Sequence, residues 1–204
     1  MNIQLDLTNI GDPDNIHAGG ERPKAGRGMI VFTGFEEFGA VNGKAHKVDI
    51  EIVAWTDPDC VAMTHSISIF YEDRTGKGHP QKVMTALGMA AGLFNARDLN
   101  QWKAAGQMPD IDFSQIVGRP AMLQLVEEPD KDNPAKTYIN VGSYGKGYYH
   151  IKDPRVKDWP KNEGIFNSHA AKVGDFVILG ATTPPPPGEA STSAAAANPF
   201  AKNT

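Results

Sequence analysis

Cysteine is almost absent from this sequence, and its scarcity removes two classes of protein. The 204 residues contain a single cysteine, Cys60. One cysteine excludes an internal disulfide framework and a zinc site built from several cysteines. Chains without disulfides are typical of reducing compartments, so we expect a cytoplasmic protein.

Long hydrophobic runs are also lacking. The mean hydropathy is −0.38, and no stretch approaches the roughly 18 apolar residues that a membrane-spanning helix needs. Residues 1–15 carry neither a basic segment nor an apolar segment, so we expect no signal peptide and no membrane partner.

A strong charge of one sign is missing as well. The net charge is −4 and the pI is about 5.8, which disfavours a polybasic binder of nucleic acid or membranes. The acidity lies in the ends of the chain, because Arg22 to Lys161 holds 18 basic and 17 acidic residues. Composition therefore leaves open an anion-binding site confined to a groove.

The ends of the chain differ in composition from the middle. Residues 1–25 are expected to be an N-terminal extension, in which Ile3, Leu5 and Leu7 alternate as in an edge strand. Residues 181–204 contain Pro184–Pro187 and then mostly Ala, Ser and Thr, a composition typical of a disordered tail. The folded domain is therefore predicted to span residues 26–180.

Period-two alternation dominates the first half of this domain. It predicts strands over 29–38, 46–55 and 61–71, with a hairpin turn at Asn42-Gly43 between the first two. In the second strand, Val48, Ile50, Ile52 and Ala54 are expected on one face. The opposite face of this strand is expected to carry Lys47, Asp49, Glu51 and Trp55.

Helical spacing replaces the alternation after Pro80. A helix is predicted from there to Phe94, and a second one between Asn95, as its N-cap, and Gly106. A single turn over 113–117 and strands over 120–128 and 136–145 follow, with 173–180 as a candidate last strand. This order predicts a mostly β fold, an OB-type five-stranded barrel with a helical insertion between strands 3 and 4. Other small α+β barrels fit the order too.

Patterns of catalysis and of metal binding are absent. No two of the six histidines have the spacing of a metal site, and His65 lies on the apolar face of its strand. Adjacent carboxylates such as Glu36-Glu37 and Glu127-Glu128 point to opposite faces of a strand and cannot share a substrate. No phosphate-binding loop or nucleophile elbow occurs. We expect no cofactor, no metal and no enzymatic activity.

Aromatic and basic residues crowd between Lys136 and Lys152. In this last strand Ile139 and Val141 are expected to point inward, and Tyr138 and Tyr144 outward. Rings can stack on unpaired bases and lysines neutralise phosphates. Tyrosines are also common in strands for packing reasons alone. The candidate DNA-binding residues are Lys47, Trp55, Phe70, Arg74, Lys77, Lys136, Tyr138, Tyr144, Lys146, Tyr148 and Tyr149.

Several stretches resemble a known family. They are ERPKAGRGMIVFTGFEEF, NGKAHKVDIEIVAW, HPQKVMTALGMAAGLF, FSQIVGRPAMLQLVEE and GYYHIKDPRVKDWPKN, with Gly118-Arg119 preceding a strand. Between Arg22 and Asn162 the chain is similar to phage-encoded proteins first catalogued as domain of unknown function 669. That family resembles OB-fold single-stranded DNA-binding proteins. The resemblance implies a role in phage DNA replication or recombination, in the cytoplasm of the host cell, alongside phage replication or recombination proteins.

Residues and resemblance lead to one expected function. The chain is expected to bind single-stranded DNA without sequence preference, by aromatic stacking and phosphate contacts, with the loops 72–79 and 127–136 beside the groove. The competing hypothesis is a structural or adaptor β-barrel that makes protein–protein contacts in a phage assembly, since Tyr and Trp also enrich protein interfaces. Pairing of an exposed strand edge with a second copy would give a homo-oligomer.

Overall fold

A single antiparallel sheet organises the chain in the computed structural model. The structure describes residues 22–40, 43–70, 79–107, 109–130, 133–142, 145–174 and 176–177. Its elements are β1 (Gly26–Ala40), β2 (Gly43–Trp55), η2 (Pro58–Cys60), β3 (Thr64–Phe70), α1 (His79–Ala90), α2 (Ala96–Ala104), η3 (Phe113–Ile116), β4 (Pro120–Pro129), β5 (Thr137–Val141), β6 (Tyr148–Tyr149), η5 (Pro154–Val156) and α3 (Glu163–Ala170).

The sheet has six strands and is not closed into a barrel. Its order is β3-β2-β1-β4-β5, and the short β6 pairs with β4. The expected helical insertion between the third and fourth strands is confirmed, because α1, α2 and η3 lie between β3 and β4 in the chain. The expected five-stranded barrel is not formed, since the sheet has a sixth strand and β3 and β5 end the order instead of pairing with each other.

Two irregularities shape the long central pairing of β1 with β2. Register shifts lie between Met29 and Ile30 and between Phe32 and Gly34. At the first shift Ile30 pairs with Ile52 and Met29 with Ala54, so Val53 is an extra residue in β2. Such bulges increase the local twist and turn the following side chains to the other face.

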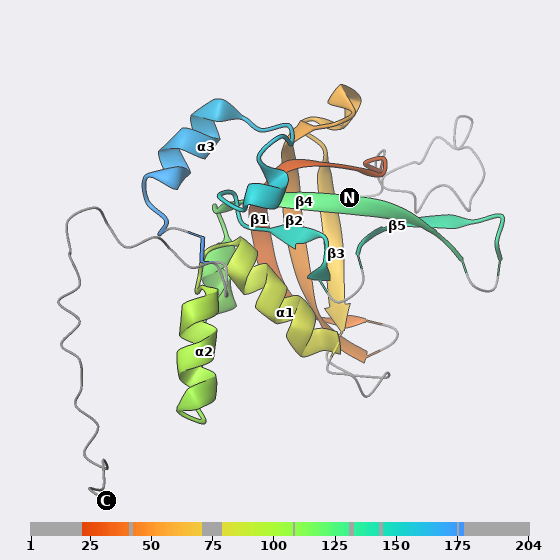
Figure 1. Cartoon of the computed structure of the whole chain (residues 1–204). Coiled ribbons are helices and arrows are strands. Elements are labelled where there is room, and N and C mark those ends of the chain that lie inside the picture. Colours follow the sequence, from red (N-terminus) through yellow and green to blue (C-terminus); the bar gives the residue numbers. More distant parts are fainter. Residues whose placement is uncertain are drawn as a thin grey trace, which may run out of the picture.

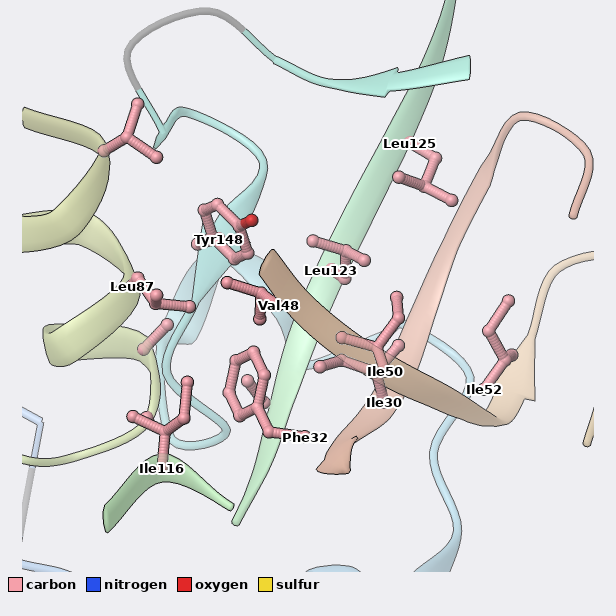
Figure 2. Packing of buried hydrophobic residues seen from close by; sticks show 14 of the residues in the cluster. Ile30, Phe32, Val48, Ile50, Ile52, Leu87, Ile116, Leu123, Leu125 and Tyr148 are labelled. Carbon is pink, nitrogen blue, oxygen red and sulfur yellow. The ribbon is translucent and has the colours of Figure 1, made fainter. Parts of the chain in front are cut away.

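The larger hydrophobic core fills one face of the sheet. The fully buried side chains on this face include Ile30, Phe32, Val48, Ile50 and Leu123. Figure 2 shows these side chains facing Leu87 of α1 and Ile116 of η3. The predicted inward face of β2 is confirmed at residues 48, 50 and 52, while Ala54 faces the other way because of the bulge.

A smaller core covers the opposite face at one end of the sheet. Met29 and Met122 meet Ile151, Val156 and Trp159 there, and residues of α3 pack around them. Figure 1 shows α2 and α3 on the side of the molecule away from β5, so β5 reaches beyond the helices.

The helices begin and end where capping chemistry is available. Asn95 caps α2 with a capping box in which Asp98 returns a bond to the Asn95 backbone. Gly106 follows α2 with a φ of 63°, a conformation that suits glycine. Helix α3 was not predicted, although Asn162 caps it by accepting from the Ile165 amide. The candidate strand over 173–180 is not one among its described residues.

Candidate nucleic-acid interface

The open side of the sheet forms a groove between β3 and β5. Its volume is about 820 Å³, in the range of ligand-binding clefts. We call it the β3–β5 groove. Its walls are Arg22, Thr33, Asp49, Thr64, His65, Ser66, Ile67, Ser68, Tyr138, Ile139, Asn140 and Val141. The groove exists because β3 and β5 approach each other without pairing.

Tyr138 presents its ring at the β5 side of the groove. It is 45% exposed, one of three large hydrophobic side chains exposed to that degree among the described residues. Its hydroxyl donates a hydrogen bond of 2.5 Å to the Asp130 carboxylate, which holds the ring in place. The predicted orientation of β5 is confirmed, because Ile139 and Val141 pack toward the main core while Tyr138 and Asn140 are exposed.

The β3 side of the groove is polar at its rim. Thr64, Ser66 and Ser68 are exposed, and the Ser66 hydroxyl donates to the Asp49 carboxylate at 2.5 Å. His65 is half-buried, and its burial, reinforced by the nearby Arg22 charge, lowers the pKa of its imidazole below the usual value. His65 is therefore neutral at pH 7 and offers polar contacts instead of a phosphate-binding cation.

Charges at the groove nearly balance. Lys47 forms ion pairs with Asp49 at 3.1 Å and with Glu36 at 3.2 Å. The hydrogen bond to Asp49, followed by that to Glu36, raises the pKa of Lys47, so it stays charged but is already compensated by carboxylates. Arg22 lines the groove, and Lys136 is exposed one residue before β5. The groove therefore offers stacking surfaces and hydrogen-bonding groups to a ligand more than it offers net positive charge.

Two of the predicted stacking rings lie in the core, and their expected exposure is wrong. Trp55 is 4% exposed and Tyr148 is 6% exposed. The extra residue Val53 turns Trp55 onto the same face as Ile52, and the Trp55 indole nitrogen donates to the Lys24 carbonyl at 3.3 Å. Tyr148 pairs with Leu123 of β4, which places its ring under α1. Neither ring can stack on a base in this conformation.

Tyr149 and Lys146 lie away from the groove. Tyr149 faces the smaller core, where its ring packs edge-on against Trp159 with 5.1 Å between centroids. The Arg155 guanidinium lies 5.0 Å from the centre of the Tyr149 ring. Lys146 is exposed beside a separate pocket that Tyr149 and Arg155 also line.

Four of the predicted site residues fall, wholly or with their side chains, outside the described part of the chain. Arg74, Lys77 and Tyr144 lie outside the described residues, as does the side chain of Phe70 at the end of β3. The loop over 72–78 lies outside them too. Of the predicted site residues, Tyr138 alone is a wall of the groove in the described part of the chain. Sequence patterns missed Arg22, because nothing marks a residue preceding β1 as a neighbour of β3 and β5.

No metal centre is found among the described residues. Within residues 22–177, apart from the gaps given above, no three His, Cys, Asp or Glu side chains gather as a metal site would require. In the same ranges no helix is both long enough and apolar enough to cross a membrane.

Comparisons with known proteins add no family. No protein-family model matches the chain, and no curated protein matches it. The similarity to the phage-encoded family stays a prediction that rests on the quoted residues.

Proposed function

We propose that this protein binds single-stranded DNA without sequence preference in the β3–β5 groove. The observation that carries the proposal is the open sheet, which leaves a groove of about 820 Å³ with an exposed aromatic ring on one wall. Unpaired bases have faces that stack on aromatic rings whatever their sequence, and one such contact is worth about 1–3 kcal/mol.

The sheet order supports an OB-like interpretation of the fold. Three meandering strands, a helical insertion, the further strands β4 and β5, and the short β6 follow one another. OB folds are partly open Greek-key barrels that bind oligonucleotides over their strand faces and loops. In this proposal the protein acts without catalysis, in phage replication or recombination, and the β3–β5 groove takes the place of the closing strand pair.

Binding of labelled oligo-dT and of a duplex of equal length, measured by fluorescence anisotropy, tests the proposal. A labelled oligonucleotide is preferable to intrinsic fluorescence, because Trp55 is buried and need not respond. We expect the single strand to bind with clearly higher affinity than the duplex. Equal affinity for the two, or no binding of either, would refute the function.

A protein-binding role is the second candidate. The outer edges of β3 and β5 carry no further strand among the described elements, and an extended peptide can add to such an edge. An adaptor module in a phage assembly would bind its partner at the outer edge of β3 or of β5. Capture of phage proteins together with failure to bind oligo-dT would favour the adaptor over the DNA-binding function.

A further inference from the structure

A second pocket lies between α1 and the segment that follows β5. Its volume is about 410 Å³, and we call it the Lys146–Arg155 pocket. Its walls include Met89 and Ala90 of α1, Phe176, and three charged residues: Lys146, Asp153 and Arg155. Lys146 is exposed and the Arg155 side chain is 69% exposed, so both cations are accessible to a ligand.

The backbone after β5 brings this pocket next to the end of the β3–β5 groove. Val141 is a wall of the groove and the last residue of β5. A Cβ on the next residue, Gly142, would lie 3.6 Å from the Lys146 Cβ. Lys146 is not a wall of the groove, but the chain returns it to the end of β5. A DNA strand that leaves the groove at this end therefore passes Lys146.

Arg155 is held in a fixed orientation from two sides. Its Nε donates to Asp153 Oδ1 at 3.0 Å, and its Nη2 donates to Asp153 Oδ2 at 2.6 Å. The guanidinium carbon lies 5.0 Å from the centre of the Tyr149 ring. The Asp153 side chain is fully buried beneath the exposed guanidinium. The pair therefore presents the guanidinium, and not the carboxylate, to the pocket.

Both cations keep unused hydrogen-bond donors. A guanidinium has five N–H donors, and Asp153 takes those of Nε and Nη2. The two N–H groups of Arg155 Nη1 have no partner among the residues that the structure describes. Lys146 forms no ion pair within those residues either, whereas Lys47 beside the groove is compensated by two carboxylates. Arginine and lysine with free donors bind phosphate oxygens by charge-assisted hydrogen bonds.

We propose that Lys146 and Arg155 bind backbone phosphates of the DNA strand where it leaves the β3–β5 groove at the end of β5. This inference rests on the proposed function and deepens it. The charges at the groove nearly balance, so a strand bound there keeps phosphates that these two cations can neutralise. Phosphates are the same whatever the base sequence, so the contacts add affinity without a sequence preference.

Two substitutions test the inference with a labelled oligo-dT of about 16 nucleotides, the upper end of the site sizes of OB folds. Lys146→Gln removes one exposed charge and should leave the unfolding temperature unchanged. We expect it to make the logarithmic salt dependence of binding shallower by about 0.7, the effect of one lost phosphate contact. Arg155→Lys keeps a positive charge beside Asp153 and removes the free Nη1 donors. We expect its Kd for this oligo-dT to rise about two- to ten-fold.

Two controls show whether the effect belongs to this place. Lys103→Gln removes an equally exposed charge from α2, which Figure 1 shows on the side away from β5, and should leave the salt dependence unchanged. An unlabelled oligo-dT of about 4 nucleotides, the lower end of the site sizes of OB folds, fits the groove alone. Measured as a competitor of the longer strand, it should bind wild type and Lys146→Gln with equal affinity.

Each contrary result has a separate meaning. An unchanged salt dependence for Lys146→Gln, together with an unchanged Kd for Arg155→Lys, would overturn the phosphate site and leave DNA binding in the groove standing. An equal change in Lys103→Gln would also overturn it, because the effect would then be one of overall charge. A loss of affinity for the 4-nucleotide strand in Lys146→Gln would contradict the placement beyond the groove. Absence of oligo-dT binding by the wild type would overturn the DNA-binding function and the phosphate site with it.

Discussion

Trp55 and Tyr138 should respond to substitution in opposite ways. Trp55→Ala removes a 4% exposed indole from the main core, together with its bond to the Lys24 carbonyl. Loss of a buried tryptophan side chain costs about 3–5 kcal/mol of unfolding free energy. In a domain of this size, each kcal/mol shifts Tm by about 2–4 °C. We therefore expect Tm to fall by about 6–20 °C.

Tyr138→Ala should leave stability nearly unchanged and weaken DNA binding. The ring is 45% exposed, so its removal should cost about 1 kcal/mol or less, most of it from the bond to Asp130. Loss of one stacking contact of about 1–3 kcal/mol corresponds to a roughly 5- to 150-fold weaker Kd for oligo-dT. Tyr138→Phe keeps the ring and should keep most of the affinity.

Thermal unfolding followed by far-UV circular dichroism and anisotropy titration of labelled oligo-dT measure the two effects. Titrations belong at a temperature where every variant is folded, and there Trp55→Ala should bind DNA nearly as the wild type does. The reverse pattern would refute the reasoning: an unchanged Tm with lost binding for Trp55→Ala, and a lowered Tm with retained binding for Tyr138→Ala.

Three further predictions concern the sheet, the pH response and the groove charge. Gly28→Ala should lower the free energy of unfolding in urea by about 1–3 kcal/mol or more, because the added Cβ would lie 2.1 Å from the Ala54 carbonyl oxygen. The control variant Gly174→Ala should leave this free energy unchanged, because its added Cβ meets no atom within 4 Å. Burial, aided by the Lys152 and His169 charges, lowers the pKa of His150 to about 4. In the unfolded chain this histidine takes up a proton near pH 6.5, so the free energy of unfolding should fall by up to about 3 kcal/mol as the pH falls from 6.5 to 4. The His150→Gln variant should show a smaller fall over the same pH range. Arg22→Gln should make the logarithmic salt dependence of oligo-dT binding shallower by about 0.7 if Arg22 contacts one phosphate, and an unchanged slope would exclude that contact.

Local patterns were sufficient for most elements of the fold. Alternation located β2 and β3, Pro80 lies in the first turn of α1, and Asn95 and Gly106 bound α2. These features depend on neighbours within a few residues, which a sequence displays directly. Closure of the sheet depends instead on whether β3 meets β5, about 70 residues later, and no local pattern reports that pairing.

The errors at the site have the same origin. A single extra residue, Val53, reverses the face of Trp55, and strict alternation cannot reveal a bulge that arises from pairing with β1. Tyr148 lies in a two-residue strand whose register is set by β4, so its burial was not visible from its own sequence neighbourhood. Tyr138 was placed correctly because Ile139 and Val141 alternate with it through a regular strand.

Photocrosslinking with an oligo-dT that carries 5-iodouracil, followed by mass spectrometry of the crosslinked peptides, tests the central claim most directly. The full chain is used, and the crosslinked residues show where the strand lies. The account predicts crosslinks at Tyr138 and in the segments that contain β3 and β5. Crosslinks at Tyr149 or Trp159 on the opposite face, without any in the β3–β5 groove, would contradict it.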